Sequence, residues 1–74
     1  MGSRKIHEFR NDYEHADRGL QHRWANVLEH NDGTYTIECF INQIHAGNRI
    51  IKGHSEQYAE DAAENFVLGL YDNP

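Results

Sequence analysis

The dipeptide Asp32-Gly33 constrains the fold more than any other feature, because it lies between two runs of residues typical of β-strands. These runs, 24–29 and 34–41, are rich in β-branched and aromatic side chains. Asp-Gly favours tight hairpins because their central residues need positive φ angles. The sequence therefore predicts an antiparallel hairpin. A two-residue Asp-Gly turn and a three-residue Asn31-Asp32-Gly33 turn both fit, and they place Trp24 on opposite faces relative to Ile41.

The segments before and after this hairpin are expected to form helices. Apolar residues recur at steps of three and four in the first segment, which predicts a helix over about 4–19. They are Ile6, Phe9, Tyr13, Ala16 and Leu20. A second helix is expected from about Glu56 to Tyr71, with Ser55 as its N-cap and Gly69 marking its end. A turn at 46–48 leads into a short third strand at 49–52.

Together these elements predict an α+β fold of order α-β-β-β-α, with a three-stranded antiparallel sheet and both helices packed on its Ile37 face. A chain of 74 residues has room for a single domain, 1–74. Residues 1–3 are expected to be a tag remnant or disordered, and 72–74 to be frayed. This arrangement leaves Phe40, Ile44 and Ile50 on the far face of the sheet.

Composition points to a soluble cytoplasmic protein. The single cysteine, Cys39, excludes an internal disulfide and favours a reducing compartment. No apolar run reaches the roughly 18 residues of a membrane span, and no signal peptide is recognisable. If the protein is viral, the compartment is the host cytoplasm.

The net charge of −5 is concentrated at the C-terminal end of the chain. From Ser55 onward there are five acidic residues and no lysine or arginine. Such asymmetry predicts an acidic surface built largely on the second helix.

No motif for catalysis, metal binding or cofactor binding is recognisable. None of the six histidines lies three or four residues from another, and no cysteine pair supports them as zinc ligands. Cys39 is expected on the core face of its strand, where a thiol is inert. Glycine-rich phosphate loops are absent. We therefore expect a protein that is not an enzyme and has no cofactor or metal.

The last helix and the expected element order resemble a double-stranded-RNA-binding domain. That family has a glycine, a serine, two lysines and then an alanine-rich helix. The matching positions here are Gly53, Ser55, Ala59, Ala62, Ala63 and Leu68. The two phosphate-binding lysines of the family correspond to Glu56 and Gln57, and the next basic position corresponds to Glu60. The resemblance therefore implies the fold with its phosphate-binding residues lost.

The overall type, a short acidic domain without a catalytic motif, is similar to the small inhibitors that phages direct against host enzymes or CRISPR complexes. We predict a protein-binding inhibitor or adaptor whose carboxylates occupy a basic, nucleic-acid-binding groove of a target protein. The carboxylates are those of Glu56, Glu60, Asp61 and Glu64, with Asp72 just beyond. Phe40, Ile44 and Ile50 would supply an apolar anchor.

Two alternatives remain open. The first is a degenerate RNA- or DNA-binding module that uses the first helix, the Asn31–Thr34 turn and the basic residues of the first helix and the third strand. Those residues are Arg4, Lys5, Arg10, Arg49 and Lys52. The second is a homodimeric structural protein joined through the Phe40 face.

Overall fold

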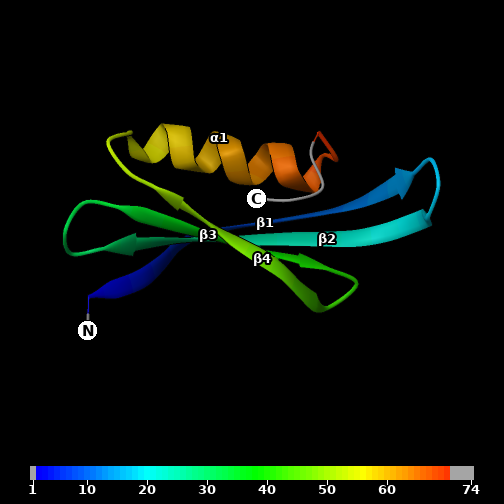
Figure 1. Cartoon of the computed structure of the whole chain (residues 1–74), viewed down its shortest axis with the longest axis horizontal. Coiled ribbons are helices and arrows are strands. Elements are labelled where there is room, and N and C mark those ends of the chain that lie inside the picture. The colour runs from blue at the N-terminus through cyan, green and yellow to red at the C-terminus, as the bar shows by residue number, and fades with distance from the viewer. Residues whose placement is uncertain (1, 71–74) are drawn as a thin grey trace.

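The computed structural model describes residues 2–70, which form one antiparallel sheet covered on one face by one helix (Figure 1). The elements are β1 (Ser3–His15), β2 (Gly19–His30), β3 (Tyr35–Ile41), β4 (Ile44–Ile51) and α1 (Glu56–Val67). The strands follow one another in the sheet in the order β1-β2-β3-β4. The expected α-β-β-β-α order, with three strands and two helices, is therefore wrong. Ser3 already belongs to β1, while Met1 and 71–74 lie outside the described residues.

The segment 4–19, expected to be a helix, is a strand followed by a turn. A helix was expected because a β-bulge gives the apolar residues of β1 a spacing like that of a helix. The pairing of β1 with β2 shifts between Lys5 and His7, so Ile6 is an extra residue in β1. Ile6 and Phe9 both pack against the core, and the bulge makes their spacing three instead of an even number. Beyond it, β1 alternates strictly, with charged side chains at every second position. These are Glu8, Arg10, Asp12 and Glu14.

The β2–β3 turn has three residues, Asn31-Asp32-Gly33. The His30 amide donates to the Thr34 carbonyl (3.0 Å), and the Gly33 amide donates to the His30 carbonyl (3.1 Å). Of the three, Gly33 has a positive φ, 86°. The Asp32 carboxylate accepts hydrogen bonds from the Thr34 amide and hydroxyl, which lower its pKa. The three-residue alternative is therefore the observed one, and it places Trp24 opposite Phe40.

The next turn is at Asn42-Gln43 and not at 46–48, which lie inside β4. Asn42 and Gln43 have φ angles of 53° and 71°, the positive values that a two-residue hairpin turn needs. Asn42 is tied to β2, since its side-chain oxygen accepts from the His22 amide (2.9 Å). Glutamine is rare at positive φ, so the sequence signal for this turn was weak. The strand expected at 49–52 is correspondingly longer and begins at Ile44.

The core lies between α1 and one face of the sheet. α1 packs mainly over β1, β2 and β3. The buried apolar residues are Ala25, Val27, Tyr35, Ile37, Cys39, Ile51, Ala59, Ala62, Ala63, Phe66 and Val67. Three alanines let the helix lie close to the sheet. Of the two helices expected on the Ile37 face, only α1 is present, and no element among residues 2–70 covers the opposite face, called the open face below.

α1 begins and ends with two recognisable caps. The Ser55 hydroxyl accepts from the Tyr58 amide (3.2 Å), as expected for an N-cap. The helix ends at Val67, earlier than expected, in a Schellman motif. In that motif the Gly69 amide donates to the Phe66 carbonyl and the Leu70 amide to the Asn65 carbonyl, each at 3.0 Å. Gly69 has φ 85° and touches Tyr13 so closely that a Cβ there would lie 2.1 Å from the ring.

Arg23 is fully buried under the C-terminal end of α1. Its guanidinium donates to the Phe66 carbonyl (3.0 Å) and twice to the Gln21 side-chain oxygen (3.1 and 2.9 Å). It also lies over the rings of Tyr13 and Phe66. A positive charge is favourable at this end of a helix because the unpaired carbonyls carry partial negative charge. Arg23 thus fastens the β1–β2 hairpin to α1.

Candidate functional site

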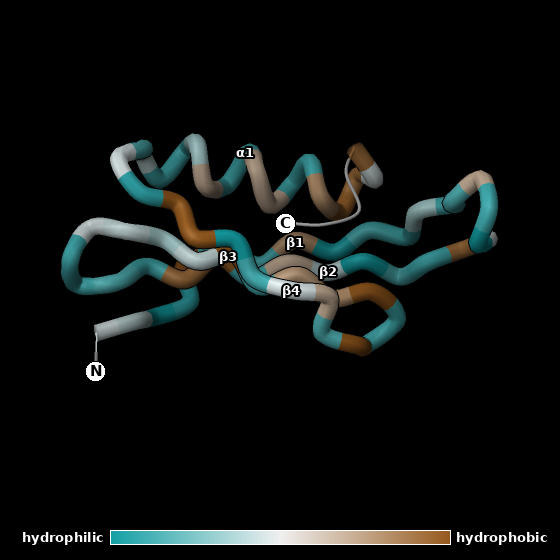
Figure 2. The backbone as a smooth tube through the Cα atoms, in the orientation of Figure 1, coloured by the Kyte–Doolittle hydropathy of each residue, from teal (hydrophilic) through white to brown (hydrophobic). Residues whose placement is uncertain are grey.

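Acidic side chains occupy the exposed side of α1. Alanines and Phe66 take up the buried side of the helix, so the polar residues between them are turned outward. Asp61 and Glu64 are exposed, as is Glu56 in the first turn, and Glu60 is partly buried. The structure therefore brings the four acidic residues predicted as a partner-binding site onto one element, and Asp72 lies outside the described residues. Figure 2 shows this side of α1 as mostly hydrophilic.

The carboxylates at the start of α1 crowd one another. The pKa of Glu56 is raised, first by a side-chain hydrogen bond with Glu60, then by desolvation, and further by the charges of Glu60 and Glu29. Desolvation raises the pKa of the Tyr35 hydroxyl, and the same three glutamates raise it further. β2 thus adds Glu29 to the acidic side of α1. A cation that approaches this cluster relieves repulsion already present in the folded protein.

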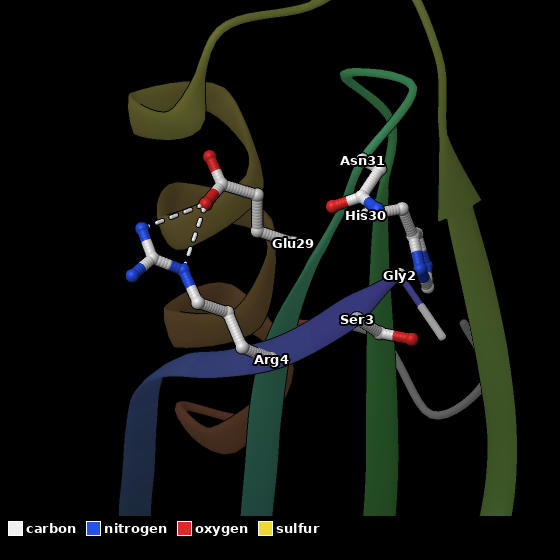
Figure 3. Close-up of a pocket in the computed structure, with 6 residues that line it drawn as sticks. All are labelled: Gly2, Ser3, Arg4, Glu29, His30 and Asn31. Atoms are coloured by element: carbon white, nitrogen blue, oxygen red, sulfur yellow. Dashed lines mark hydrogen bonds and ion pairs between the residues drawn. The ribbon is translucent and has the colours of Figure 1, made fainter.

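Arg4 lies at the margin of this acidic cluster. Its guanidinium donates to Glu29 Oε1 from Nε (3.1 Å) and Nη2 (3.0 Å), as Figure 3 shows. The two residues belong to a shallow hollow of about 240 Å³ at the start of β1. Its lining is Gly2, Ser3, Arg4, Glu29, His30 and Asn31. The Arg4 side chain is 76% exposed, so this contact is a weak surface ion pair.

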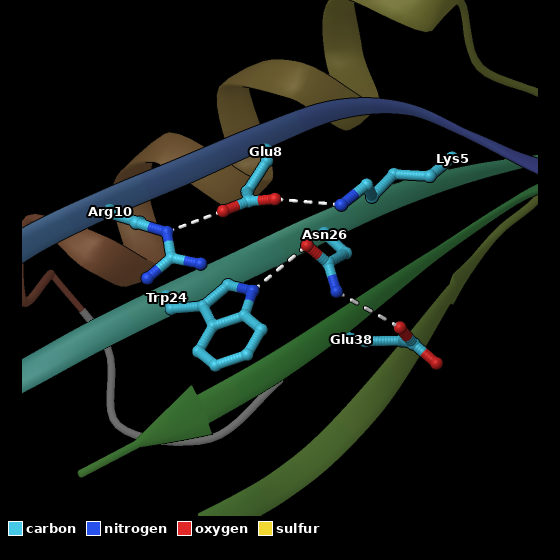
Figure 4. A network of polar contacts seen from close by, with 6 residues as sticks. All are labelled: Lys5, Glu8, Arg10, Trp24, Asn26 and Glu38. Atoms are coloured by element: carbon cyan, nitrogen blue, oxygen red, sulfur yellow. Dashed lines mark hydrogen bonds and ion pairs between the residues drawn. The ribbon is translucent and has the colours of Figure 1, made fainter. Parts of the chain in front are cut away.

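The open face of the sheet has a polar network at its centre (Figure 4). Glu8 accepts from Lys5 (2.7 Å) and from Arg10, and these hydrogen bonds, that of Lys5 first, lower its pKa. On the neighbouring strands, the Asn26 amide donates to Glu38 Oε1 (3.3 Å). The Asn26 oxygen accepts from the Trp24 indole N–H (2.9 Å). The centre of this face is therefore charged and hydrogen-bonded.

A row of stacked side chains crosses the same face beside this network. Arg10 lies over the Trp24 ring (4.5 Å), Trp24 stacks on Phe40 (4.6 Å between centroids), and Phe40 contacts His45 (5.3 Å). The row crosses all four strands because the register pairs Arg10 with Trp24, Trp24 with Phe40 and Phe40 with His45. Sequence reasoning did not anticipate this row, since β1 was expected to be a helix.

The three apolar residues predicted as an anchor do not form one patch. Phe40 belongs to the stacked row and is partly buried by Trp24. Ile50 pairs with Thr36 elsewhere on the open face and is 58% exposed. Ile44 pairs with Ile41 at the tip of the β3–β4 hairpin and is 72% exposed. Figure 2 shows that hairpin tip as hydrophilic at its turn and hydrophobic on either side of it.

The basic residues of the nucleic-acid alternative are likewise dispersed. Arg4 is paired with Glu29, and Lys5 and Arg10 share Glu8. Arg49 lies on β4 and Lys52 just after it, at the opposite edge of the sheet from β1. Such a distribution does not make the continuous basic stripe that follows a phosphate backbone.

Nucleophilic and metal chemistry finds little support in the described part of the chain. Cys39 is buried, and desolvation raises its pKa to about 11, so the thiol is protonated at neutral pH. Among residues 2–70, no three His, Cys, Asp or Glu side chains are grouped as metal ligands would be. Over the same residues, no helix has the length and apolar character needed to cross a lipid bilayer.

Comparison of the chain with protein-family models, with curated protein sequences and with solved structures gave no match.

Proposed function

We propose that this protein acts by binding another protein, as an inhibitor or adaptor, and not by catalysis. The binding surface is the acidic side of α1, formed by Glu56, Glu60, Asp61 and Glu64, together with Glu29. The partner offers a basic surface, such as a groove that otherwise holds nucleic-acid phosphates. The observation that carries the proposal is the gathering of Glu56, Asp61 and Glu64, all exposed, on one helix with Glu60 among them. A hydrogen bond with Glu60 and the charges of Glu60 and Glu29 raise the pKa of Glu56, while Arg4, which is paired with Glu29 at the margin, partly offsets this.

Charge complementarity favours a basic partner in two ways. A concentrated negative field speeds the encounter with a positive surface, and that advantage falls as salt screens it. The carboxylates are also held on a rigid helix fixed by caps at both ends, so little order is lost when a partner binds. The proposed setting is the cytoplasm, because the buried Cys39 has no second cysteine to pair with.

The open face favours neither alternative. Packing two copies face to face through Phe40 would bury Glu8 and Glu38 near the middle of the contact, and burying a carboxylate is costly. For nucleic acid, Arg10 over Trp24 is suited to stacking on a base. However, Arg10 and Lys5 are both paired with Glu8, which offsets part of their positive charge.

The test uses three forms of the protein as bait in a cell extract. The first is the wild type, the second is Glu60→Lys/Asp61→Lys/Glu64→Lys, and the third is the size-matched neutral form Glu60→Gln/Asp61→Asn/Glu64→Gln. We expect the wild type to retain a basic nucleic-acid-binding protein that elutes with salt and is displaced by duplex DNA. The neutral form should retain less and the reversed form none. Equal retention by all three forms, insensitive to salt, would contradict the proposal.

A direct measurement addresses the nucleic-acid alternative. The purified protein is titrated into fluorescent RNA and DNA duplexes at low salt. We expect no binding, since the protein and the duplex are both negatively charged. Clear binding that weakens with salt, and that is lost in Arg4→Ala/Lys5→Ala/Arg10→Ala, would replace the proposal with the nucleic-acid module.

A further inference from the structure

The two edges of the sheet differ in how they are protected from pairing with another strand. Strand edges expose unpaired N–H and C=O groups, and proteins commonly protect them with charges or bulges. At one edge, β1 carries six charged residues, which are Arg4, Lys5, Glu8, Arg10, Asp12 and Glu14. At the other edge, β4 carries one, Arg49. β4 also has a bulge at Ala46, but Gly47–Ile51 pairs with β3 in regular register.

β4 therefore offers a short template for a fifth strand. In an antiparallel ladder, alternate residues of an edge strand turn both their N–H and C=O away from the neighbouring strand. Within Gly47–Ile51 these groups face outward, where the described residues supply no further strand. On the open face Ile50 stands beside this edge, 58% exposed. An incoming strand would gain backbone hydrogen bonds and an apolar contact.

Beside this edge, α1 leaves a groove on the covered face. α1 lies over β1, β2 and β3, and the groove between it and β4 has a volume of about 340 Å³. Its lining is Arg49, Tyr58, Asp61, Ala62 and Asn65. The groove therefore contains one basic residue, Arg49 on β4, and one acidic residue, Asp61 on α1. The crowded carboxylates Glu56 and Glu60 lie instead toward Glu29 on β2.

We infer that a second copy of this chain pairs with the β4 edge in antiparallel fashion, joining two sheets into one of eight strands. A two-fold interface must be complementary to itself, and the groove meets this requirement. Arg49 of one copy faces Asp61 of the other, and the reverse contact forms at the same time. A guanidinium has five N–H donors, so this contact adds to those that Arg49 makes within its own chain. The paired Ile50 side chains form the apolar part of the contact.

This arrangement is consistent with the charge of the protein. Net charge opposes self-association, but in the dimer the most crowded carboxylates are turned away from the shared edge. A domain of this size has a modest core, and a partner strand adds to its stability. The two-fold axis is perpendicular to the sheet, so both α1 helices lie on the same side.

The experiment measures mass by light scattering from about 10 μM to 1 mM. We expect the wild type to move from one chain to two as concentration rises. Arg49→Glu and Asp61→Arg should each weaken dimerisation at least about tenfold, since like charges then meet. The charge-matched control Glu14→Arg, on β1, should dimerise as the wild type does.

Mixing the two weakened variants provides the sharper test. Arg49→Glu carries two acids at the shared edge and Asp61→Arg carries two bases, so both intermolecular contacts become favourable in the mixed pair. Within each variant chain, positions 49 and 61 still carry like charges, so association of the mixture cannot result from a restored contact inside one chain. We expect the mixture to form dimers at concentrations where each variant alone is a monomer. A wild type that stays monomeric throughout, or a mixture that does not associate, would overturn the inference. A dimer insensitive to both substitutions would show that another surface is used.

Discussion

The two faces of the sheet are built from the same four strands but are stabilised in different ways. The covered face buries apolar side chains and one arginine beneath α1. The open face leaves its aromatic side chains only partly buried and fills its centre with ion pairs and amide hydrogen bonds. Burial contributes far more free energy than exposed ion pairs do. We therefore expect the covered face to determine stability, while the open face tolerates substitution.

The largest contrast compares one phenylalanine from each face. Phe66→Ala removes a ring that is 0% exposed and should lower the free energy of unfolding by about 3 to 5 kcal/mol. Phe40→Ala removes a partly buried ring and should cost about 1 to 2 kcal/mol. Urea denaturation followed by circular dichroism measures both. Equal losses would mean that the open face is as tightly packed as the core.

Arginine provides the second contrast. Arg23→Met leaves the Phe66 carbonyl and the Gln21 side chain without this donor, and it should cost about 2 to 4 kcal/mol. Arg10→Met loses an exposed ion pair and the guanidinium that lies over Trp24, and it should cost about 1 kcal/mol. Thermal unfolding of the two variants at one pH gives the comparison. A larger loss of stability for Arg10→Met than for Arg23→Met would mean that the ion pairs of the open face, and not the buried Arg23, stabilise the fold.

Glycine tests how closely the covered face is packed at its end. Gly69→Ala should cost about 3 kcal/mol, because it combines a strained positive φ with displacement of the Tyr13 ring. Gly53→Ala has a similar φ, 74°, but nothing within 4 Å, so it should cost about 1 kcal/mol. The difference between their urea midpoints isolates the contact with Tyr13. Equal losses of stability in Gly69→Ala and Gly53→Ala would mean that the close contact between Gly69 and Tyr13 does not contribute to the cost.

The smallest effect is a pair of opposite pH dependences. The pKa of Glu56 is raised above 4.5, so its ionisation destabilises the folded protein as pH rises through that pKa. The pKa of Glu8 is lowered, so the stability that its ionisation contributes is lost as pH falls through it. Glu56→Gln should therefore raise the urea midpoint at pH 7 and Glu8→Gln should lower it. Both differences should vanish well below pH 4.5, and shifts of the same sign at pH 7 would contradict this account.

Local chemistry was readable from the sequence where one residue type determines the geometry. Ser55 as a cap, Gly69 at the helix end and a hairpin turn containing Asp32-Gly33 follow from side-chain or φ requirements. The length of that turn, two residues or three, did not follow from the sequence. The first strand was missed because the bulge at Ile6 gave its apolar residues a helical spacing, although the charges from Glu8 to Glu14 alternate. The Asn42-Gln43 turn was missed because glutamine seldom takes a positive φ.

The candidate site was predictable in part. The acidic residues of α1 are neighbours in sequence, so their clustering needs only the helix. The addition of Glu29, the stacked row through Trp24 and the groove beside β4 depend on strand register, which local patterns do not specify. The only sign in the sequence that Arg23 is buried is its position two residues before Ala25 and four before Val27, because alternate residues of a strand lie on the same face.

The position of Arg23 also affects when the core can fold during synthesis on the ribosome. The guanidinium is made early, but its acceptor at Phe66 is added 43 residues later. During synthesis the four strands emerge before α1, so the covered face stays open to water or to chaperones in the interval. Closure of the core must therefore wait for the last turn of the helix. The nascent chain should remain sensitive to protease until that turn has left the exit tunnel.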